Sequence, residues 1–384
     1  MAISGLGEKG DMRISLVGDV APRRADPASL FADTGAVLRA ADLCFGQMEC
    51  PVSSRGTQAP QARLAMRTDP GVPAVLRAAG FDVMSVAGNH VLDFGVPALE
   101  DTLRLLPAAG IATCGAGPNL AAARQPAWLE HHGRRVAVLA YSSILPAGYA
   151  ADAARPGCAP MRAHTVYEQV EPDQPGMLPR IHTFADRADL AALEADVRAA
   201  RARADTVLVS LHWGLHFVRA SVADYQREVA AAAIRAGATA VVGHHPHLLK
   251  GVEFIAGAPV FYSLGNFAIE QPAAFDAAIA EHDSFRHLQT LAAGWQPRGR
   301  YQAPPETRHT VIAHLDLTGG ALRVVLQPCR IDDDSVPRRL ARDDPAHAEW
   351  LAYLRAITAE AGLNAVYAEQ PDGLVTCAAA LTAG

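Results

Sequence analysis

The chain has 384 residues, of which 50% are hydrophobic and 19% are charged. That composition supplies a full core and excludes an intrinsically disordered chain, while the length fits two domains or one large α/β domain. The formal net charge of -6, with only two lysines, argues against a nucleic-acid-binding protein, because phosphate backbones are bound by clustered basic side chains. Histidine, with 15 residues, is the unusual feature of the composition.

The start of the chain and its cysteines predict the compartment. The first ten residues lack the basic stretch and apolar run of a secretory signal, and no run of about 18 apolar residues would span a membrane. The six cysteines show no CxxC spacing, and several stand in apolar runs where a thiol acts as a small hydrophobe. We therefore expect a cytoplasmic protein with reduced cysteines and no membrane partner.

Short apolar runs alternate with amphipathic segments in the first part of the chain, which is typical of β-α units. In chain order, the pattern predicts a strand over 14–17, a strand over 42–47, a helix over 72–79, a strand over 81–86, a helix over 96–106 and a strand over 136–141. Gly80 marks the end of the first helix, because glycine suits the left-handed conformation of a helix C-cap. From about 145 to 182 the pattern dissolves into a lid-like insertion.

The second half returns to the same alternation and then changes character. It predicts a helix over 186–204, a strand over 206–211, a helix over 223–236, strands over 239–242 and 260–263, a β-hairpin over 310–327 and a helix over 346–361. A second irregular insertion, near 270–306, carries His282, His287 and Trp295. We predict a catalytic domain over 1–331 with two lids and a helical extension over 332–384 that packs on it.

Polar side chains gather directly after five of the predicted strands. Open α/β sheets hold their ligands at the carboxyl ends of their strands, so these side chains are expected to converge. Imidazoles and oxygen ligands at successive strand ends are what a metal site or an acid/base site requires. The residues are Asp19, Gln47, Glu49, Asn89, His90, Asp93, His212, His216, His244, His245 and His247.

Six motifs that contain these residues resemble, in one order, the motif set of the CapA-type (poly-γ-glutamate capsule synthesis) proteins, a branch of the calcineurin-like metallophosphoesterases. The resemblance covers about residues 13 to 330. It implies an α/β fold with a four-layer αββα sandwich, the calcineurin-like metallophosphoesterase fold, and a site at one edge of it. The motifs are Gly18-Asp19, Gln47 to Pro51, Gly88 to Gly95, His212 to Gly214, Gly243 to His247 and Tyr262 to Phe267.

Three departures from the superfamily pattern bear on the metal. Val20 and Ala21 follow Asp19 where the superfamily has a histidine ligand, Glu49 replaces a bridging aspartate, and His216 stands where the family often has Glu. These changes disfavour a dinuclear iron or zinc centre and leave mainly oxygen donors, which favours Ca²⁺ over Mn²⁺ or Mg²⁺. No organic cofactor is expected. The predicted metal ligands are Asp19, Glu49, Asn89, His212, His245 and His247.

With the metal held by oxygen, the histidines are available for proton transfer. An imidazole exchanges protons near neutral pH, more readily when a carboxylate orients it, and His90 and Asp93 have the spacing of such a pair. Two imidazoles on opposite faces of one carbon would serve an epimerase, whereas hydrolysis would need one activated water and one acid. The predicted catalytic residues are His90, Asp93, His245, Asp19, His212 and His247.

Three function classes compete at this point. The hypothesis of a metal-dependent phosphoesterase rests on fold analogy alone. The hypothesis of a capsule-polymer protein outside the membrane is disfavoured by the lack of a recognisable secretion signal. The soluble peptide epimerases of lasso-peptide biosynthesis, which belong to the CapA-like family, match a histidine-rich chain with two long insertions. We predict a metal-dependent epimerase of a ribosomal precursor peptide, with a phosphoesterase or a peptide or poly-γ-glutamyl hydrolase as the alternative. The oligomeric state is left open.

The remaining histidines receive simpler interpretations. His131 and His132 precede Gly133 in a polar turn and are expected to be exposed to solvent. His309 and His314 lie in or beside the predicted hairpin and are expected to be structural.

Overall fold

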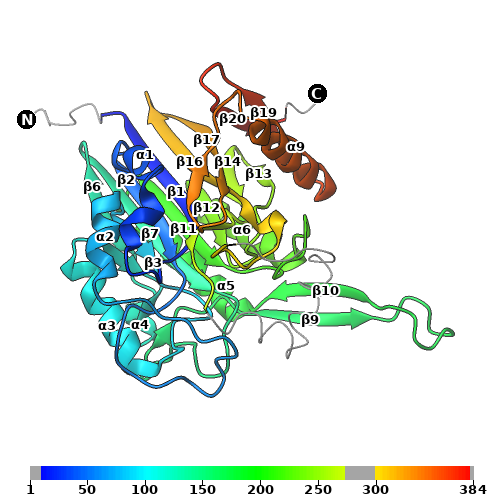
Figure 1. Ribbon diagram of the computed structural model, residues 1–384. Coiled ribbons are helices and arrows are strands. Elements are labelled where there is room, and N and C mark those ends of the chain that lie inside the picture. Colours follow the sequence, from blue (N-terminus) through cyan, green and yellow to red (C-terminus); the bar gives the residue numbers. More distant parts are fainter. Residues whose placement is uncertain (1–9, 273–298, 381–384) are drawn as a thin grey trace, which may run out of the picture.

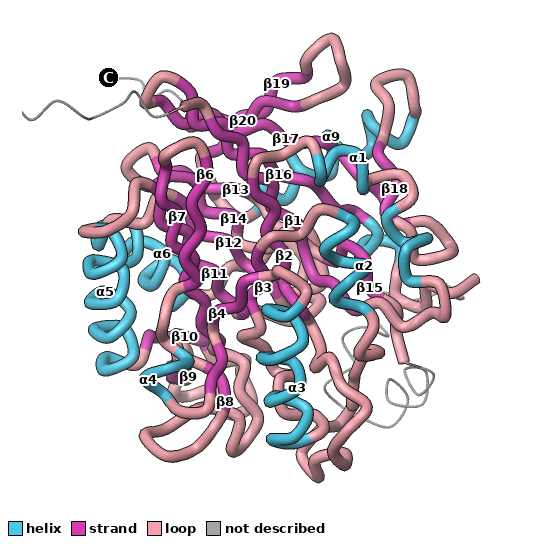
Figure 2. The backbone as a smooth tube through the Cα atoms, turned by 90° about the vertical axis from the view of Figure 1, so that its left-hand side faces the viewer, coloured by secondary structure: helices cyan, strands magenta, loops and turns pink. Residues whose placement is uncertain are grey.

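Two β-sheets lie face to face in the computed structural model, and helices cover their outer faces (Figure 1). The structure describes residues 10–272 and 299–380. Figure 2 shows the strands enclosed between α5 (Arg187–Arg201) on one side and α2 (Val72–Ala79) and α3 (Gly95–Ala108) on the other. The predicted αββα sandwich is therefore confirmed.

The first sheet combines strands from both ends of the chain. Its centre is β1 (Met12–Ala21), which runs parallel to β2 (Leu43–Met48) and antiparallel to β16 (His309–Thr318). The spatial order is β19 (Ala365–Glu369), β20 (Val375–Ala379), β17 (Ala321–Ile331), β16, β1, β2, β3 (Val83–Ser85) and β4 (Ala112–Cys114), while β15 (Asn266–Ile269) pairs with β1 and β18 (Pro337–Arg339) with β17.

The second sheet is built around parallel strands with one antiparallel strand at each edge. Its order is β13 (Val252–Ile255), β14 (Ala258–Phe261), β12 (Ala240–His244), β11 (Thr206–His212), β7 (Arg134–Ser142) and β6 (Ala127–His131). Because the parallel strands share one direction, their carboxyl ends meet at one edge of the sandwich.

Alternation along the strands explains the layers, since successive side chains of a strand point to opposite faces. In β7, Val136 and Val138 pack into the core between the two sheets, whereas Leu139 packs into a separate core under the outer helices. Leu193 of α5 and Val229 of α6 (Asp224–Ala236) belong to that second core. A strand buried on both faces must be apolar at nearly every position, which is the pattern that predicted it.

Capping residues fix two of the helix boundaries, the end of α2 and the start of α5. Gly80 ends α2 at φ 119°, a conformation that glycine adopts without strain. The side chain of Asp186 caps α5 by accepting hydrogen bonds from two backbone N–H groups. The other helices are η1 (Pro27–Phe31), α1 (Gly35–Arg39), α4 (Leu120–Ala123), η3 (Pro305–Arg308) and α9 (Pro345–Glu360).

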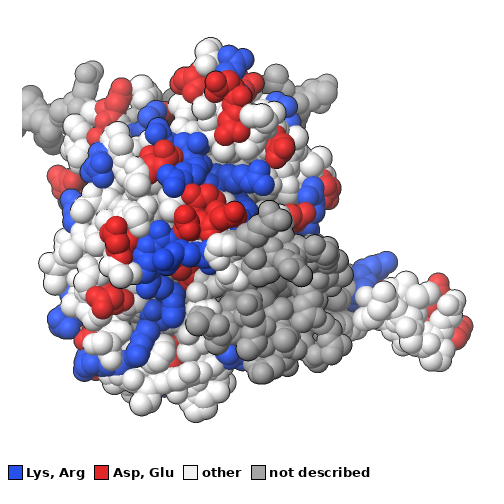
Figure 3. Space-filling model, in the orientation of Figure 1, with Lys and Arg blue, Asp and Glu red and all other residues white. Residues whose placement is uncertain are grey.

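The first insertion is more regular than the sequence suggested. It contains β8 (Gly157–Cys158), which pairs with β5 (Ala116–Gly117), and the antiparallel strands β9 (Ala163–Glu168) and β10 (Arg180–Ala185). The two long strands form an arm that projects from the sandwich (Figure 1) and is largely uncharged (Figure 3). Its exposed apolar residues are Val166, Tyr167, Val170, Met177, Leu178, Ile181 and Phe184. Because these apolar side chains face solvent, the segment lacks the alternation of apolar and polar residues that predicts a core-facing strand, and the sequence did not predict β9 and β10.

The C-terminal part contains strands as well as the expected helix. After α9, the hairpin of β19 and β20 extends the first sheet by pairing with β17. Trp350 of α9 donates from Nε1 to the carbonyl of Thr310, which fixes the helix against the sheet. In the second insertion, His282, His287 and Trp295 lie outside the described residues. Within 10–272 and 299–380, no helix is both long and apolar enough to cross a bilayer.

Candidate metal and acid–base site

The site is built on the close crossing of β1 and the chain before β15. The sequence predicted the first strand over 14–17, but β1 continues to Ala21, and at Asp19 it pairs with β15. A Cβ atom at Gly18 would lie 1.9 Å from the carbonyl oxygen of Gly265, so only glycine allows this approach. The crossing places the Asp19 carboxylate in the interior of the sandwich edge, fully buried.

Asp19 is held by two imidazoles, one from the last residue of β12 and one from the loop that follows it. Nδ1 of His244 lies 3.2 Å from Oδ1 of Asp19, and Nδ1 of His247 lies 3.2 Å from Oδ2. Nδ1 of His247 also lies 2.7 Å from Oδ1 of Asn266, whose amide group donates to the hydroxyl of Tyr301. Burial alone would raise the pKa of Asp19, but the two imidazoles beside the carboxylate outweigh this effect and hold the pKa well below its usual value.

Glu49 follows β2 and lies in the same buried space. Neither of its carboxylate oxygens has a hydrogen-bond partner among the described residues. Its Oε2 atom lies 3.8 Å from Nδ1 of His212, and its Oε1 atom lies 3.7 Å from Nε2 of His247. Burial raises the pKa of Glu49, and the nearby charges of Asp19 and Asp93 raise it further.

The orientation of His212 follows from its neighbour Asn89. Nε2 of His212 lies 2.7 Å from Oδ1 of Asn89, so the amide oxygen accepts the ring N–H at that nitrogen. This leaves the lone pair on Nδ1, which is buried without a hydrogen-bond partner among the described residues. Burial lowers the pKa of His212 well below its usual value, which keeps the ring neutral. A neutral imidazole with a free lone pair is the form that binds a metal.

Asp19, Glu49 and His212 together fit a divalent metal. Each offers one ligand atom, and these atoms lie within 4.8 Å of one another. Two buried carboxylates with unsatisfied oxygens would be costly without a cation between them. Half of the fourteen buried polar side-chain atoms that lack a hydrogen bond in the described chain cluster here, namely Asp19 Oδ2, Gln47 Oε1, Glu49 Oε1 and Oε2, His212 Nδ1, His244 Nε2 and His245 Nδ1.

A second histidine–aspartate pair lies at the wall of the site. Nδ1 of His90 lies 2.6 Å from Oδ2 of Asp93. Asp93 also accepts a hydrogen bond from the backbone N–H of Met66 at 2.8 Å and one from the hydroxyl of Tyr149 at 3.2 Å. The carboxylate is therefore fixed from three sides, and it orients the His90 ring so that Nε2, which has no hydrogen-bond partner among the described residues, can transfer a proton.

The loop after β12 is strained where it presents its histidines. His245 has φ 94° and His247 has φ 53°, backbone angles that residues other than glycine rarely adopt. Such backbone conformations cost free energy and are held in place by the surrounding structure. His245 stacks on His216 with ring centroids 4.9 Å apart, and burial lowers the pKa of both imidazoles.

A cavity of about 700 Å³ opens over these groups. Asn89, His90, Asp93, His245 and His247 line it, together with the predicted strand-end residue His216. Its other walls are mainly apolar and come from the loops before α2 and after β7, including Leu64, Met66, Ile144, Leu145 and Pro146. A volume of this size accommodates a ligand as large as a short peptide segment.

The structure brings most of the sequence-predicted residues together. Asp19, Glu49 and His212 form the buried group, Asn89 contacts His212, and His247 contacts both carboxylates. His90 and Asp93 form a pair on the cavity wall. His245 lies beside the rings of His212 and His216, with ring centroids 4.9 Å away in each case. Its predicted role as a ligand stays a prediction.

Three residues with a place in the site were not among the predicted ligands or catalytic groups. His244 contacts Asp19, Asn266 contacts His247, and Tyr149 contacts Asp93. His244 was among the predicted strand-end residues but was given no role, and Asn266 stands inside the last motif, so the strand-end rule could have selected it too. Tyr149 belongs to the irregular insertion and carries no such signal.

Comparisons with known proteins point to one family. A family model described as "Bacterial capsule synthesis protein PGA_cap" matches residues 10–271. The PGA biosynthesis protein CapA of Bacillus subtilis (strain 168) is 28% identical over 285 residues, which cover 73% of this chain and 65% of that protein. A probable polyglutamine synthesis accessory protein of Mycobacterium tuberculosis is 30% identical over 342 residues, which cover 88% of this chain and 77% of that protein.

The match spans only part of the length of some of these relatives. The chain covers 65% of the Bacillus subtilis protein and 54% of the capsule biosynthesis protein CapA of Bacillus anthracis, to which it is 26% identical. Among solved structures, a hypothetical protein from Thermus thermophilus matches 83% of this chain and 99% of its own, with a TM-score of 0.43 and 15% identity.

Proposed function

We propose that this chain, which belongs to the PGA_cap family of bacterial capsule synthesis proteins, is a metal-dependent peptide epimerase. It would invert a Cα centre near the C-terminus of a ribosomal precursor peptide, as lasso-peptide biosynthesis requires. The observation that supports this proposal is a pair of histidine–aspartate contacts beside one cavity. His90 pairs with Asp93, His247 pairs with Asp19, and both imidazoles line the cavity.

Inversion of a Cα centre needs a base on one face of the carbon and an acid on the other. One imidazole removes the Cα proton, and the opposite imidazolium returns a proton to the other face, so the peptide keeps its length and composition. Asp93 holds Nδ1 of His90 and leaves Nε2 for this transfer. Either direction uses the same two groups with their protonation states exchanged.

The second imidazole, His247, is oriented at Nδ1 by a hydrogen bond to the amide oxygen of Asn266, and the same nitrogen lies 3.2 Å from the carboxylate of Asp19. A carboxylate beside the ring stabilises the imidazolium that forms when the ring takes up a proton. Asn266 is held in turn by Tyr301, so the ring is fixed by a chain of hydrogen bonds. This fixed orientation is what supports a role in stereospecific proton transfer.

Asp19, Glu49 and His212 would hold the metal, with Asn89 orienting His212. When bound, a divalent cation supplies positive charge that stabilises the negative charge on the substrate's carbonyl oxygen as the Cα proton leaves. We favour Ca²⁺ because two carboxylates supply most of the donors, and the nitrogen of His212 makes Mn²⁺ its nearest competitor. Mg²⁺ is the third ion to test.

The cavity matches a peptide better than a small ester. Apolar side chains such as Leu64, Met66 and Leu145 line it together with the acid/base groups. Apolar walls suit side chains of a peptide, and the few polar groups fix its backbone. We propose a precursor peptide as the partner and expect no nucleic-acid partner. We also retain the proposal of a cytoplasmic location.

A hydrolase is the second candidate, and the names of the relatives favour it. Two relatives are described as a PGA biosynthesis protein and a capsule biosynthesis protein, and a peptide or poly-γ-glutamyl hydrolase would suit such a setting. Hydrolysis would use one imidazole, such as His90, as the acid for the leaving group. A phosphoesterase would use the same group on a phosphoester.

The experiment that separates these functions is incubation of the metal-loaded protein in D₂O with three kinds of probe. The probes are a pool of all-L synthetic peptides that differ in the C-terminal residue, a poly-γ-glutamate oligomer and p-nitrophenyl phosphate. The epimerase predicts one deuterium at Cα in a peptide of unchanged length. If the peptide or the oligomer is shortened, or nitrophenol is released, and no deuterium appears at Cα, the epimerase proposal is wrong. The product formed then identifies the protein as a peptidase, a poly-γ-glutamyl hydrolase or a phosphoesterase.

A further inference from the structure

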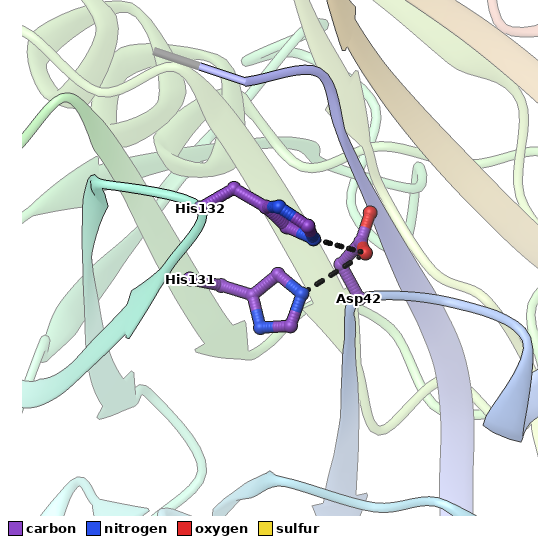
Figure 4. A group of neighbouring side chains, drawn as sticks. All are labelled: Asp42, His131 and His132. Atoms are coloured by element: carbon purple, nitrogen blue, oxygen red, sulfur yellow. Dashed lines mark hydrogen bonds and ion pairs between the residues drawn. The ribbon is translucent and has the colours of Figure 1, made fainter. Parts of the chain in front are cut away.

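A second group of metal-ligating side chains lies at the end of the sandwich opposite the cavity. Asp42 directly precedes β2, whereas Glu49 of the first site follows that strand. His131 and His132 stand at the turn between β6 and β7 (Figure 4). Asp42 therefore belongs to the first sheet and the two histidines to the second.

The turn conformation places both imidazoles on the same side. Adjacent residues of a strand point to opposite faces, so two consecutive histidines would normally diverge. His132 has φ 48° and Gly133 has φ 70°, which is the conformation of a tight hairpin turn. The turn folds the His132 ring back beside that of His131, with ring centroids 4.2 Å apart, and both rings point toward Asp42 (Figure 4).

The spacing of the ligand atoms matches the coordination sphere of zinc. Nε2 of His131 lies 3.0 Å and Nε2 of His132 lies 3.3 Å from the same oxygen, Oδ1 of Asp42. Ligand atoms at about 2.0 Å from a tetrahedral zinc ion are about 3.3 Å apart, so the three atoms need little movement to receive the ion. All three lie within 4.8 Å of one another.

The carboxylate is oriented from behind by the backbone of β1. The N–H group of Arg13 donates to Oδ2 of Asp42 at 2.7 Å, and the N–H group of Asp42 donates to the carbonyl of Arg13 at 3.0 Å. These bonds occupy Oδ2 and leave Oδ1 facing the imidazoles. Hydrogen bonds that orient a ligating carboxylate are a recurring feature of metal sites.

We propose that Asp42, His131 and His132 form a second metal site, for Zn²⁺ or a similar transition-metal ion such as Ni²⁺ or Cu²⁺. Two imidazoles and one carboxylate suit these ions better than Ca²⁺ or Mg²⁺, and the half-exposed position leaves room for water to complete the coordination. The site is distinct from the oxygen-rich one below the cavity. Because its ligands come from both sheets, a bound ion links the two layers of the sandwich.

The test is a Zn²⁺ titration by calorimetry, combined with the visible absorption of bound Co²⁺. It is run on the Glu49→Gln protein, in which binding at the first site is weakened, so that the second site is measured in isolation. We expect one equivalent of Zn²⁺ and an intense tetrahedral Co²⁺ spectrum. Asp42→Asn, and the double variant His131→Ala and His132→Ala, should each weaken binding at least about tenfold.

The matched control is His164→Ala. His164 is an exposed histidine that lies 3.0 Å from a single carboxylate, that of Asp186, with no second imidazole on that oxygen in the described chain. This control should retain Zn²⁺ binding and the Co²⁺ spectrum. Unchanged binding in both test variants, or an equal loss in the control, would overturn the proposal. Far-ultraviolet circular dichroism checks folding, and the single variant His132→Ala replaces any variant that does not fold.

Discussion

Nδ1 of His90 lies 2.6 Å from Oδ2 of Asp93, and this contact joins a cavity-lining imidazole to a carboxylate that is itself held by Met66 and Tyr149. Asp93→Asn keeps the shape of the side chain but removes the charge that orients the ring. We expect the rate of Cα proton exchange to fall about 100-fold or more, since general acid–base catalysis contributes on that scale.

The control for this variant is Tyr149→Phe, which removes a neighbouring hydrogen bond to Asp93 but leaves the carboxylate beside His90. Its exchange rate should stay within about tenfold of the unmodified protein, because one neutral hydrogen bond contributes about 1 kcal/mol. Equal losses in the two variants would assign the effect to general loosening of the site.

Glu49→Gln should stabilise the metal-free protein and abolish its stabilisation by metal. The carboxylate is buried without hydrogen bonds from the described residues, so its charge destabilises the fold. Since its pKa is raised in the folded state, this destabilisation grows as the pH rises above the ordinary value near 4.5. We expect a gain of about 1–3 kcal/mol in the free energy of unfolding at pH 7.

The measurement is urea unfolding in a chelator and again in Ca²⁺, Mn²⁺ or Mg²⁺. The unmodified protein should gain stability with at least one of these ions, and the variant should gain none. A variant that is less stable than the unmodified protein in the chelator would contradict the buried-charge explanation.

Gly18→Ala should destabilise the protein and displace Asp19. A Cβ atom would lie 1.9 Å from the backbone oxygen of Gly265, which cannot move without shifting β15. We expect a loss of about 1–3 kcal/mol or more by thermal unfolding. Gly71→Ala is the control, because its nearest atom is a side-chain oxygen of Asp69 at 3.1 Å. Equal unfolding temperatures for the two variants would show that the crossing tolerates a methyl group.

The protein should lose stability as the pH falls, because protonation of the buried His314 ring favours the unfolded chain. Burial lowers its pKa to about 4, and Arg13 adds to the effect, so the unfolded chain binds the proton more strongly. Stability from this group is complete above pH 6.5 and is lost on going down to pH 4, by at most about 3 kcal/mol. His314→Asn should flatten the pH dependence of urea unfolding in this range. The exposed variant His164→Ala should leave it unchanged.

Much of the sandwich could be predicted because its signals are local. The helix over 72–79 and the buried strand over 206–211 follow from apolar periodicity and a glycine stop, and the structure has them as α2 and within β11. The gathering of Asp19, Glu49 and His212 follows from their positions at or just beyond the carboxyl ends of parallel strands. The roles of these residues in catalysis stay predictions.

The features that could not be predicted depend on contacts between distant parts of the chain, or on segments whose sequence lacks the pattern of a core-facing strand. The pairing of His244 with Asp19 joins residues more than half the chain apart, and no local rule selects His244 for it over His212 or His247. The β9–β10 arm exposes apolar side chains on both faces, so its alternation did not mark a buried surface. The shared oxygen of Asp42 likewise depends on two sheets meeting.

The most direct test of the two-histidine mechanism is deuterium exchange at Cα measured separately on the L- and D-forms of one peptide that the protein epimerises. His90→Ala and His247→Ala should both abolish epimerisation. If each imidazole serves one face, one variant retains exchange only with the L-peptide and the other only with the D-peptide. Exchange of both forms by either variant, or epimerisation that persists in both, would contradict the account.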